Sequence, residues 1–120
     1  MTEAEALKLS SSFGGGFGRM REICGALTGA GIVLGALYGY DSPDDNKLKS
    51  EHYARIQNFA KAFEAQNGAI LCKDLLKNLN ADTAPVTSPR DEKFYRTRPC
   101  LKFVESAAEL LDKFIEEKTL

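Results

Sequence analysis

Three cysteines, Cys24, Cys72 and Cys100, are the side chains of this sequence best suited to redox chemistry. No two of them form a C-x-x-C pair, which excludes a thioredoxin-type motif and a zinc ribbon. Their odd number also argues against a framework of disulfides, because such a framework uses cysteines in pairs. Cysteine is among the residues most often buried, so core packing is the alternative for each one taken alone.

The predicted places of two cysteines favour reactive thiols. Cys72 falls in the opening turns of a predicted helix. Cys100 directly follows Pro99, and two arginines, Arg96 and Arg98, stand just before it. A helix N-terminus presents partial positive charge, and together with guanidinium groups it favours a thiolate over a thiol.

Cys24 is expected on a helix face that meets the same core, so the three thiols are able to converge. Cys24, Cys72 and Cys100 are therefore candidate redox residues and candidate ligands of a metal ion or an iron–sulfur cluster. Three thiolates are one short of the usual four, so a monomer would need His52, water or a ligand from a second chain. His52 is the only histidine and stands among charged residues, and we expect it to be solvated.

A glycine-rich tract, FGGGFGR at residues 13–19, precedes Cys24. Glycines that lead into a helix with arginines in its first turns can offer backbone N–H groups to an anion. Gly14, Gly15, Gly16 and Arg19 are candidate anion-binding residues on this ground. The tract has neither the preceding strand of a dinucleotide-binding unit nor the Gly-Lys-Ser/Thr ending of a P-loop. A tight turn between two helices is the interpretation that we favour.

Apolar residues recur at three- and four-residue spacing along most of the chain, which indicates amphipathic helices. We expect five helices: one from a capping box at Thr2 to about Ser12, one from Gly16 to Tyr38, a third that Gly68 ends, a fourth directly after it, and a last one that begins at Pro99. The expected core includes Met20, Leu27, Phe59, Phe63, Leu75, Val104 and Leu111. No segment alternates as a strand would, so the prediction is an all-α fold, a compact bundle with a glycine-rich central helix in a single domain over residues 1–120.

Composition narrows the classes of partner. The 120 residues include 16 basic and 17 acidic side chains for a net charge of -1, which gives no reason to expect a nucleic-acid partner. Residues 23–40 carry no charge over 18 positions, close to the minimum for a membrane span. The mean hydropathy of -0.29 favours a buried central helix and no membrane. The start, MTEAEALK, has no apolar leader, and we expect a reducing, cytoplasmic compartment.

Glycines four residues apart mark the expected second helix: Gly25 and Gly29, then Gly31, Gly35 and Gly39. Small residues at this spacing let a neighbouring backbone approach closely. Each interior glycine costs roughly 0.5–1 kcal/mol of helix stability relative to alanine, so we expect a close contact in return. We predict a homodimer with this helix or the terminal helix at its interface, and we expect Gly35→Leu to disturb that packing.

Three stretches of the chain resemble the C-GCAxxG-C-C family, small helical proteins described as redox-active. The stretch SSFGGGFGRMREICGALTGAGIVLGALYG is similar to the glycine-rich centre of the family, ILCKDLL to its next cysteine block, and RPCLKFVESAAELLDKF to its cysteine-led terminal helix. The resemblance implies that Cys24, Cys72 and Cys100 occupy the family's functional positions. The chain departs from the family pattern in two ways. No cysteine precedes Cys24, and the GCAxxG tract is not intact, with Phe17 where a cysteine would fit.

Two hypotheses of function follow. The first is a cytoplasmic helical protein whose three cysteines carry out thiol redox chemistry with a partner protein, or hold a metal or iron–sulfur centre. The second is a non-catalytic helical protein for interaction or dimerisation, in which the cysteines are structural. A single histidine with no marked nucleophile gives no Ser-His-Asp site to consider.

Overall fold

The computed structural model describes residues 1–77, 79, 82–86 and 99–117. Within these residues the elements are α1 (Glu3–Ser10), the 3-10 turn η1 (Ser11–Phe13), α2 (Gly25–Tyr38), α3 (Asn46–Asn67), α4 (Cys72–Leu75) and α6 (Cys100–Glu117). The described part has no strand, only an isolated antiparallel bridge between Ile23 and Leu71. The prediction of an all-α bundle is confirmed.

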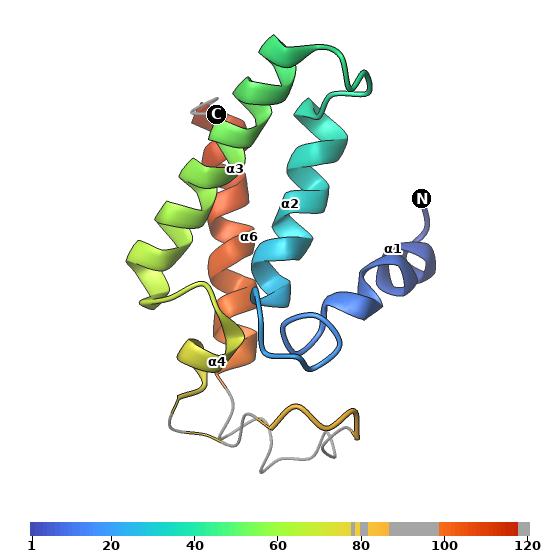
Figure 1. Cartoon of the computed structure of the whole chain (residues 1–120). Coiled ribbons are helices and arrows are strands. Elements are labelled where there is room, and N and C mark those ends of the chain that lie inside the picture. Colours follow the sequence, from blue (N-terminus) through green and yellow to red (C-terminus); the bar gives the residue numbers. More distant parts are fainter. Residues whose placement is uncertain (78, 80–81, 87–98, 118–120) are drawn as a thin grey trace.

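Three long helices, α2, α3 and α6, lie side by side and each contacts the other two (Figure 1). Their shared core is apolar and consists of Leu27, Ala30, Leu34, Phe59, Phe63, Ala107 and Leu110. Aromatic rings of α6 join it edge to face, with Phe114 5.1 Å from Phe59 and Phe103 6.4 Å from Phe63 between ring centroids. The bundle is therefore held by burial of apolar surface.

The ends of the helices follow the capping signals of the sequence. Thr2 and Glu5 form the predicted capping box of α1, with both hydrogen bonds at 3.1 Å. Asp45 caps α3 by accepting a hydrogen bond from the N–H of Leu48. Gly68 ends α3 as predicted, with φ at 93°, a left-handed conformation that glycine adopts without strain.

The second helix begins at Gly25, so the prediction that it begins at Gly16 is wrong. The backbone before it is left-handed at Gly15, Gly16, Phe17, Gly18, Arg19 and Arg21. Left-handed residues cannot continue a right-handed helix, and glycines make such a run possible. Residues 14–24 thus form a coiled loop, here called the glycine loop.

Two expected core residues lie at the surface instead. Met20 is 57% exposed because it belongs to the glycine loop, and Val104 is 53% exposed because the buried face of α6 runs through Ala107 and Leu110. Leu75 and Leu111 are partly buried against the core. The fourth helix, α4, is also shorter than expected and ends at Leu75.

Three interior glycines of α2 have no close neighbour among the described residues. A Cβ added at Gly29, Gly31 or Gly35 would meet nothing within 4 Å. The expected close contact is therefore not made within the described chain at these three glycines, and a contact with a second chain, which Gly35→Leu would disturb, stays a prediction. The close approach occurs at Gly25, where a Cβ would lie 2.6 Å from the carbonyl oxygen of Phe13.

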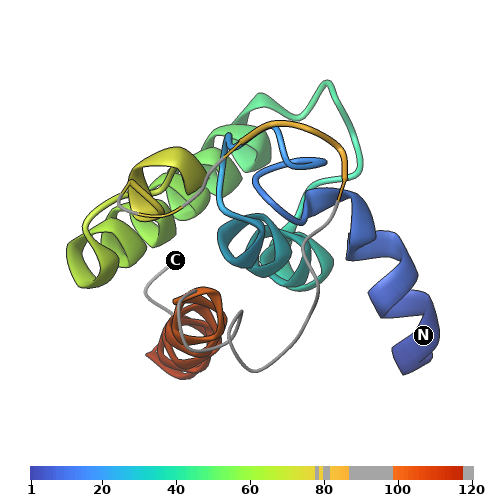
Figure 2. The ribbon, with the colours of Figure 1, turned by 90° about the horizontal axis from the view of Figure 1, so that it is seen from below.

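Helix α1 projects away from the three long helices and has no buried residue (Figure 2). It joins the rest of the fold through η1, which contacts α2. Among the described residues, no helix combines the length and the apolar character that crossing a membrane requires.

Candidate functional site

Each cysteine stands where a helix starts. Cys24 is the N-cap of α2, whereas Cys72 and Cys100 are the first residues of α4 and α6. The starts of these three helices gather at the same end of the bundle (Figure 1). The predicted positions of Cys72 and Cys100 are confirmed, but Cys24 precedes its helix rather than lying within it. None of the three forms a disulfide.

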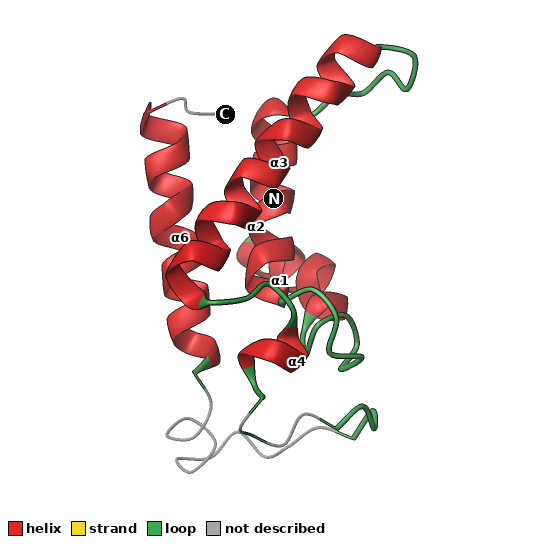
Figure 3. Ribbon diagram, turned by 60° about the vertical axis from the view of Figure 1, so that its left-hand side comes forward, coloured by secondary structure: helices red, strands yellow, loops and turns green. Residues whose placement is uncertain are grey.

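Backbone hydrogen bonds tie the segment of Cys24 to that of Cys72. The N–H of Cys24 donates to the carbonyl of Ile70 at 2.9 Å, and the N–H of Cys72 donates to the carbonyl of Glu22 at 2.6 Å. These bonds flank the bridge between Ile23 and Leu71, and they hold α4 against the glycine loop (Figure 3).

This pairing makes the two cysteines near neighbours at the bridge. Cys24 directly follows Ile23, and Cys72 directly follows Leu71, the two bridged residues. The two cysteines are diagonal neighbours, a relation in which Cα atoms are roughly 7–8 Å apart. A disulfide usually needs a Cα separation of about 4.4–6.8 Å, so joining the two sulfurs requires the two backbone segments to approach each other.

The surroundings of Cys24 favour its neutral thiol. Burial is the main cause that raises its pKa, and the charges of Cys72 and then Cys100 raise it further. The backbone N–H groups of Ala26 and Leu27 lower the pKa, but less than burial raises it. Both other cysteines therefore lie within electrostatic reach of Cys24, and Cys72 has the larger effect.

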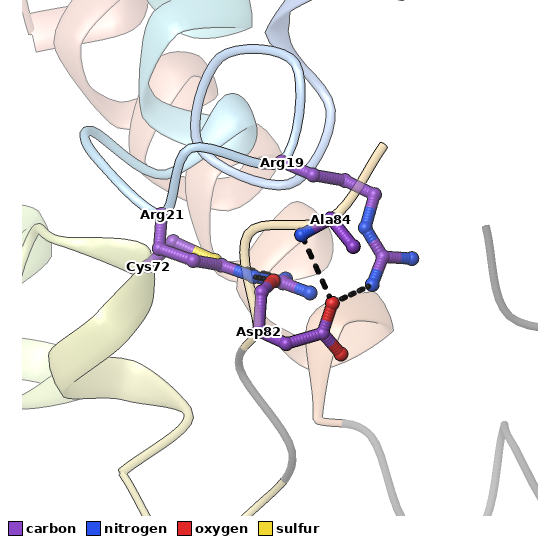
Figure 4. A network of polar contacts seen from close by, with 5 residues as sticks. All are labelled: Arg19, Arg21, Cys72, Asp82 and Ala84. Carbon is purple, nitrogen blue, oxygen red and sulfur yellow. Dashed lines mark hydrogen bonds and ion pairs between the residues drawn. The ribbon is translucent and has the colours of Figure 1, made fainter. Parts of the chain in front are cut away.

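Arg21 contacts the sulfur of Cys72 (Figure 4). Its side chain is only 6% exposed, and its NH1 group donates to Cys72 Sγ at 3.6 Å. Its Nε–H donates to the carbonyl oxygen of Asp82 at 2.9 Å. The carboxylate of Asp82 in turn pairs with Arg19 at 3.2 Å and accepts from the N–H of Ala84. The segment around Asp82 thereby anchors both arginines of the glycine loop.

Gly16 allows the glycine loop to pack directly on Cys72. A Cβ added to Gly16 would lie 2.7 Å from the Cβ of Cys72 and 2.6 Å from the backbone nitrogen of Glu22. Its φ of 69° is also one that other residues rarely adopt. The absence of a side chain at Gly16 is therefore needed for the packing of Cys72 against the loop.

Most backbone N–H groups of the glycine loop donate hydrogen bonds within the loop or to the residues just before it. The N–H groups of the six residues from Phe17 to Glu22 all donate to carbonyl oxygens of residues 12–17. The side chain of Arg19 is engaged by Asp82. The anion site expected at Gly14, Gly15, Gly16 and Arg19 stays a prediction. The six amides from Phe17 to Glu22 already donate hydrogen bonds within the loop or to the residues just before it.

His52 is buried, with 9% of its surface exposed, so the expectation that it is solvated is wrong. It lies beside Tyr40, just beyond the C-terminal end of α2, whereas Cys24 precedes the start of that helix. A helix of 14 residues is about 21 Å long. His52 is therefore too far away to complete a metal site with Cys24.

Sequence reasoning missed the contact of Arg21 with Cys72 and the anchoring role of Asp82. The only available signal was the pair of arginines next to the glycines, which had been considered for an anion. The other predicted partners of a thiolate, Arg96 and Arg98, lie outside the described residues. Within the described part of the chain, no three His, Cys, Asp or Glu side chains are arranged to hold a metal ion.

The raised pKa of Cys24 leads to a prediction on its alkylation. Below that pKa the thiolate fraction grows about tenfold per pH unit, so the reaction with iodoacetamide should keep accelerating beyond pH 9. At neutral pH it should be slower in the native protein than in the urea-unfolded chain. Peptide mass spectrometry of quenched samples measures both rates for Cys24 alone. A rate that levels off below pH 8 would contradict the raised pKa of this half-buried thiol.

Fold and site define a class: an all-α protein with cysteines at the starts of converging helices, one of them against a buried arginine. The chain belongs to the family described as "Putative redox-active protein (C_GCAxxG_C_C)", whose profile matches residues 1–114. The resemblance seen in the sequence is thereby confirmed. The family pattern contains four cysteines, whereas this chain has three. Neither a curated protein nor a solved structure matches the chain.

Proposed function

We propose that this protein carries out thiol–disulfide exchange, with Cys24 and Cys72 as its working pair. The contact of the Arg21 guanidinium with Cys72 Sγ carries the proposal. Membership of a family described as redox-active and the backbone bridge that joins the two cysteine segments support it.

The burial of Arg21 explains why this contact matters. Arginine stays charged in proteins, and a buried charge is costly unless an opposite charge or several hydrogen bonds compensate it. In the described structure its side chain has two polar partners, the carbonyl oxygen of Asp82 and the sulfur of Cys72. The sulfur of Cys72 is therefore one of the two groups that compensate the charge of Arg21 in the described structure.

The exchange proceeds in two displacements. Cys24 is the more exposed of the pair, so its sulfur, after losing its proton to solvent, attacks a disulfide of the partner molecule. A mixed disulfide forms and one partner thiolate leaves. The Cys72 thiolate then attacks the sulfur of Cys24, which forms the Cys24–Cys72 disulfide and releases the second partner thiolate. The protein loses two electrons, the partner gains two, and protons from solvent convert the released thiolates to thiols.

A metal or iron–sulfur centre held by Cys24, Cys72 and Cys100 is the other chemistry that the cysteines suggest. The positive charge of Arg21 beside Cys72 disfavours a cation at that sulfur. A set of three thiolates also needs a fourth ligand from outside the group. We therefore propose exchange between thiols as the chemistry of the site.

Equilibration with glutathione buffers of stepped redox potential tests the proposed function. Two of the three thiols should disappear together in a single two-electron transition, and the variant Cys100→Ser should show the same transition. Cys24→Ser and Cys72→Ser should lack it. Thiols that react only after unfolding, in proportion to the loss of structure, would instead identify the cysteines as core residues.

Exposed apolar surface favours a homodimer as a second proposal. Helix α2 carries no charge, yet its outer face exposes Ile32, Val33 and Leu37, and the projecting α1 exposes Leu7 and Leu9. A helix that is apolar on all sides is normally covered. Light scattering at roughly tens of micromolar should give twice the mass of one chain, and Val33→Lys should reduce it to one chain. A monomer in both proteins would remove this proposal.

A further inference from the structure

An apolar groove of about 780 Å³ runs between α2 and α3. It is lined by Leu27, Gly31 and Gly35 from α2, by Ile56 and Ala60 from α3, and by Ile70. None of the described residues that line it is Asp, Glu, Lys or Arg. Its volume falls in the range of small-molecule sites, about 300–1,000 Å³. The glycines leave room in it, since added Cβ atoms at Gly31 and Gly35 would touch nothing.

His52 provides a fixed hydrogen-bond donor at one end of the groove. Arg55 NH1 lies 2.9 Å from His52 Nδ1, and because a guanidinium can only donate, Nδ1 accepts and the proton sits on Nε2. Burial and then the charge of Arg55 lower the pKa of His52, which keeps the ring neutral. The Nε2–H group has no partner among the described residues, whereas the nearby hydroxyls of Tyr40 and Tyr53 bond to each other at 2.8 Å.

We propose that this groove binds a small carboxylic acid with an apolar body, its head accepting a hydrogen bond from His52 Nε2. The body matches the uncharged walls, which extend along most of α2. The polar head of the ligand must be a hydrogen-bond acceptor, because the Nε2–H group of His52 is a donor. Arg55 behind His52 adds positive charge, which favours an anionic acceptor over a neutral one and repels an ammonium group. This site is independent of the cysteine chemistry.

Calorimetric titration with decanoate, decanol and decylamine, each below its aggregation concentration, tests the chemistry of the groove. Decanoate should bind most tightly, decanol about tenfold more weakly, and decylamine should not bind measurably. His52→Leu should remove the preference for decanoate over decanol while it keeps the apolar contact. Equal binding of decanoate and decylamine, or no binding of decanoate, would overturn the proposal.

Two leucine variants of α2 test the location. Gly35 lines the groove and Gly29 does not, yet both have open space at the Cβ position and both variants gain helix propensity. Gly35→Leu should fill the groove and lower decanoate affinity at least about tenfold, and Gly29→Leu should leave it within about twofold. Unchanged affinity in Gly35→Leu would overturn the assignment. So would a dimer that Gly35→Leu converts to a monomer, because a second copy of the chain would then occupy the groove.

Discussion

Gly16→Ala is expected to lower the free energy of unfolding by about 2–4 kcal/mol. The added methyl group would lie 2.7 Å from the Cβ of Cys72 and 2.6 Å from the backbone nitrogen of Glu22. These neighbours are the sides of the bridge that holds the cysteine segments together, and neither is the end of a flexible side chain. Urea denaturation followed by circular dichroism measures the loss.

Gly18→Ala is the matched control for that substitution. Gly18 lies in the same loop with a φ of 57°, but a Cβ there would meet nothing within 4 Å. Gly18→Ala should therefore lower the free energy of unfolding only by the cost of a left-handed backbone at alanine, roughly 1–2 kcal/mol. Equal losses in the two variants would show that backbone conformation alone, and not contact with Cys72, explains the need for glycine at residue 16.

Arg21→Met should slow the second displacement of the exchange at least about tenfold, because it removes the positive charge in contact with the sulfur that attacks in that step. Methionine keeps much of the apolar stem of arginine, so the loop retains its packing. A stopped-flow reaction with a small aromatic disulfide measures the exchange.

Arg19→Met and Arg21→Lys separate charge from structure in this experiment. Arg19 belongs to the same loop and pairs with Asp82, whose carboxylate is 44% exposed, so its loss should change the exchange rate less than about twofold. Arg21→Lys keeps a positive charge near Cys72 and should retain part of the exchange rate. If Arg21→Met leaves the exchange rate unchanged, Arg21 has only a structural role.

Local signals in the sequence were sufficient to predict the helices and several of their ends. The capping box at Thr2, the glycine after α3 and the proline before α6 each act through hydrogen bonds or backbone preferences of adjacent residues. The apolar spacing also predicted the buried face of α3, because Phe59 and Phe63 are one helical turn apart and both are fully buried.

The glycine loop could not be predicted in this way. Met20 and Ile23 continue the apolar spacing of α2, yet left-handed backbone at Arg19 and Arg21 interrupts the helix. No propensity favours such a conformation for arginine, and contacts with distant residues must stabilise it. The position of Arg21 against Cys72 depends on pairing with a segment far along the chain, and periodicity carries no information on that pairing.

Peptide mapping of the oxidised protein tests the central claim most directly. After oxidation by glutathione disulfide, alkylation of the remaining thiol and digestion without reductant, mass spectrometry identifies which cysteine peptides are linked. We predict a linkage between the peptides of Cys24 and Cys72 within one chain, with Cys100 alkylated, and the same linkage in Cys100→Ser. A disulfide that always includes Cys100, or linkages found only between chains, would contradict the assignment of Cys24 and Cys72 as the working pair.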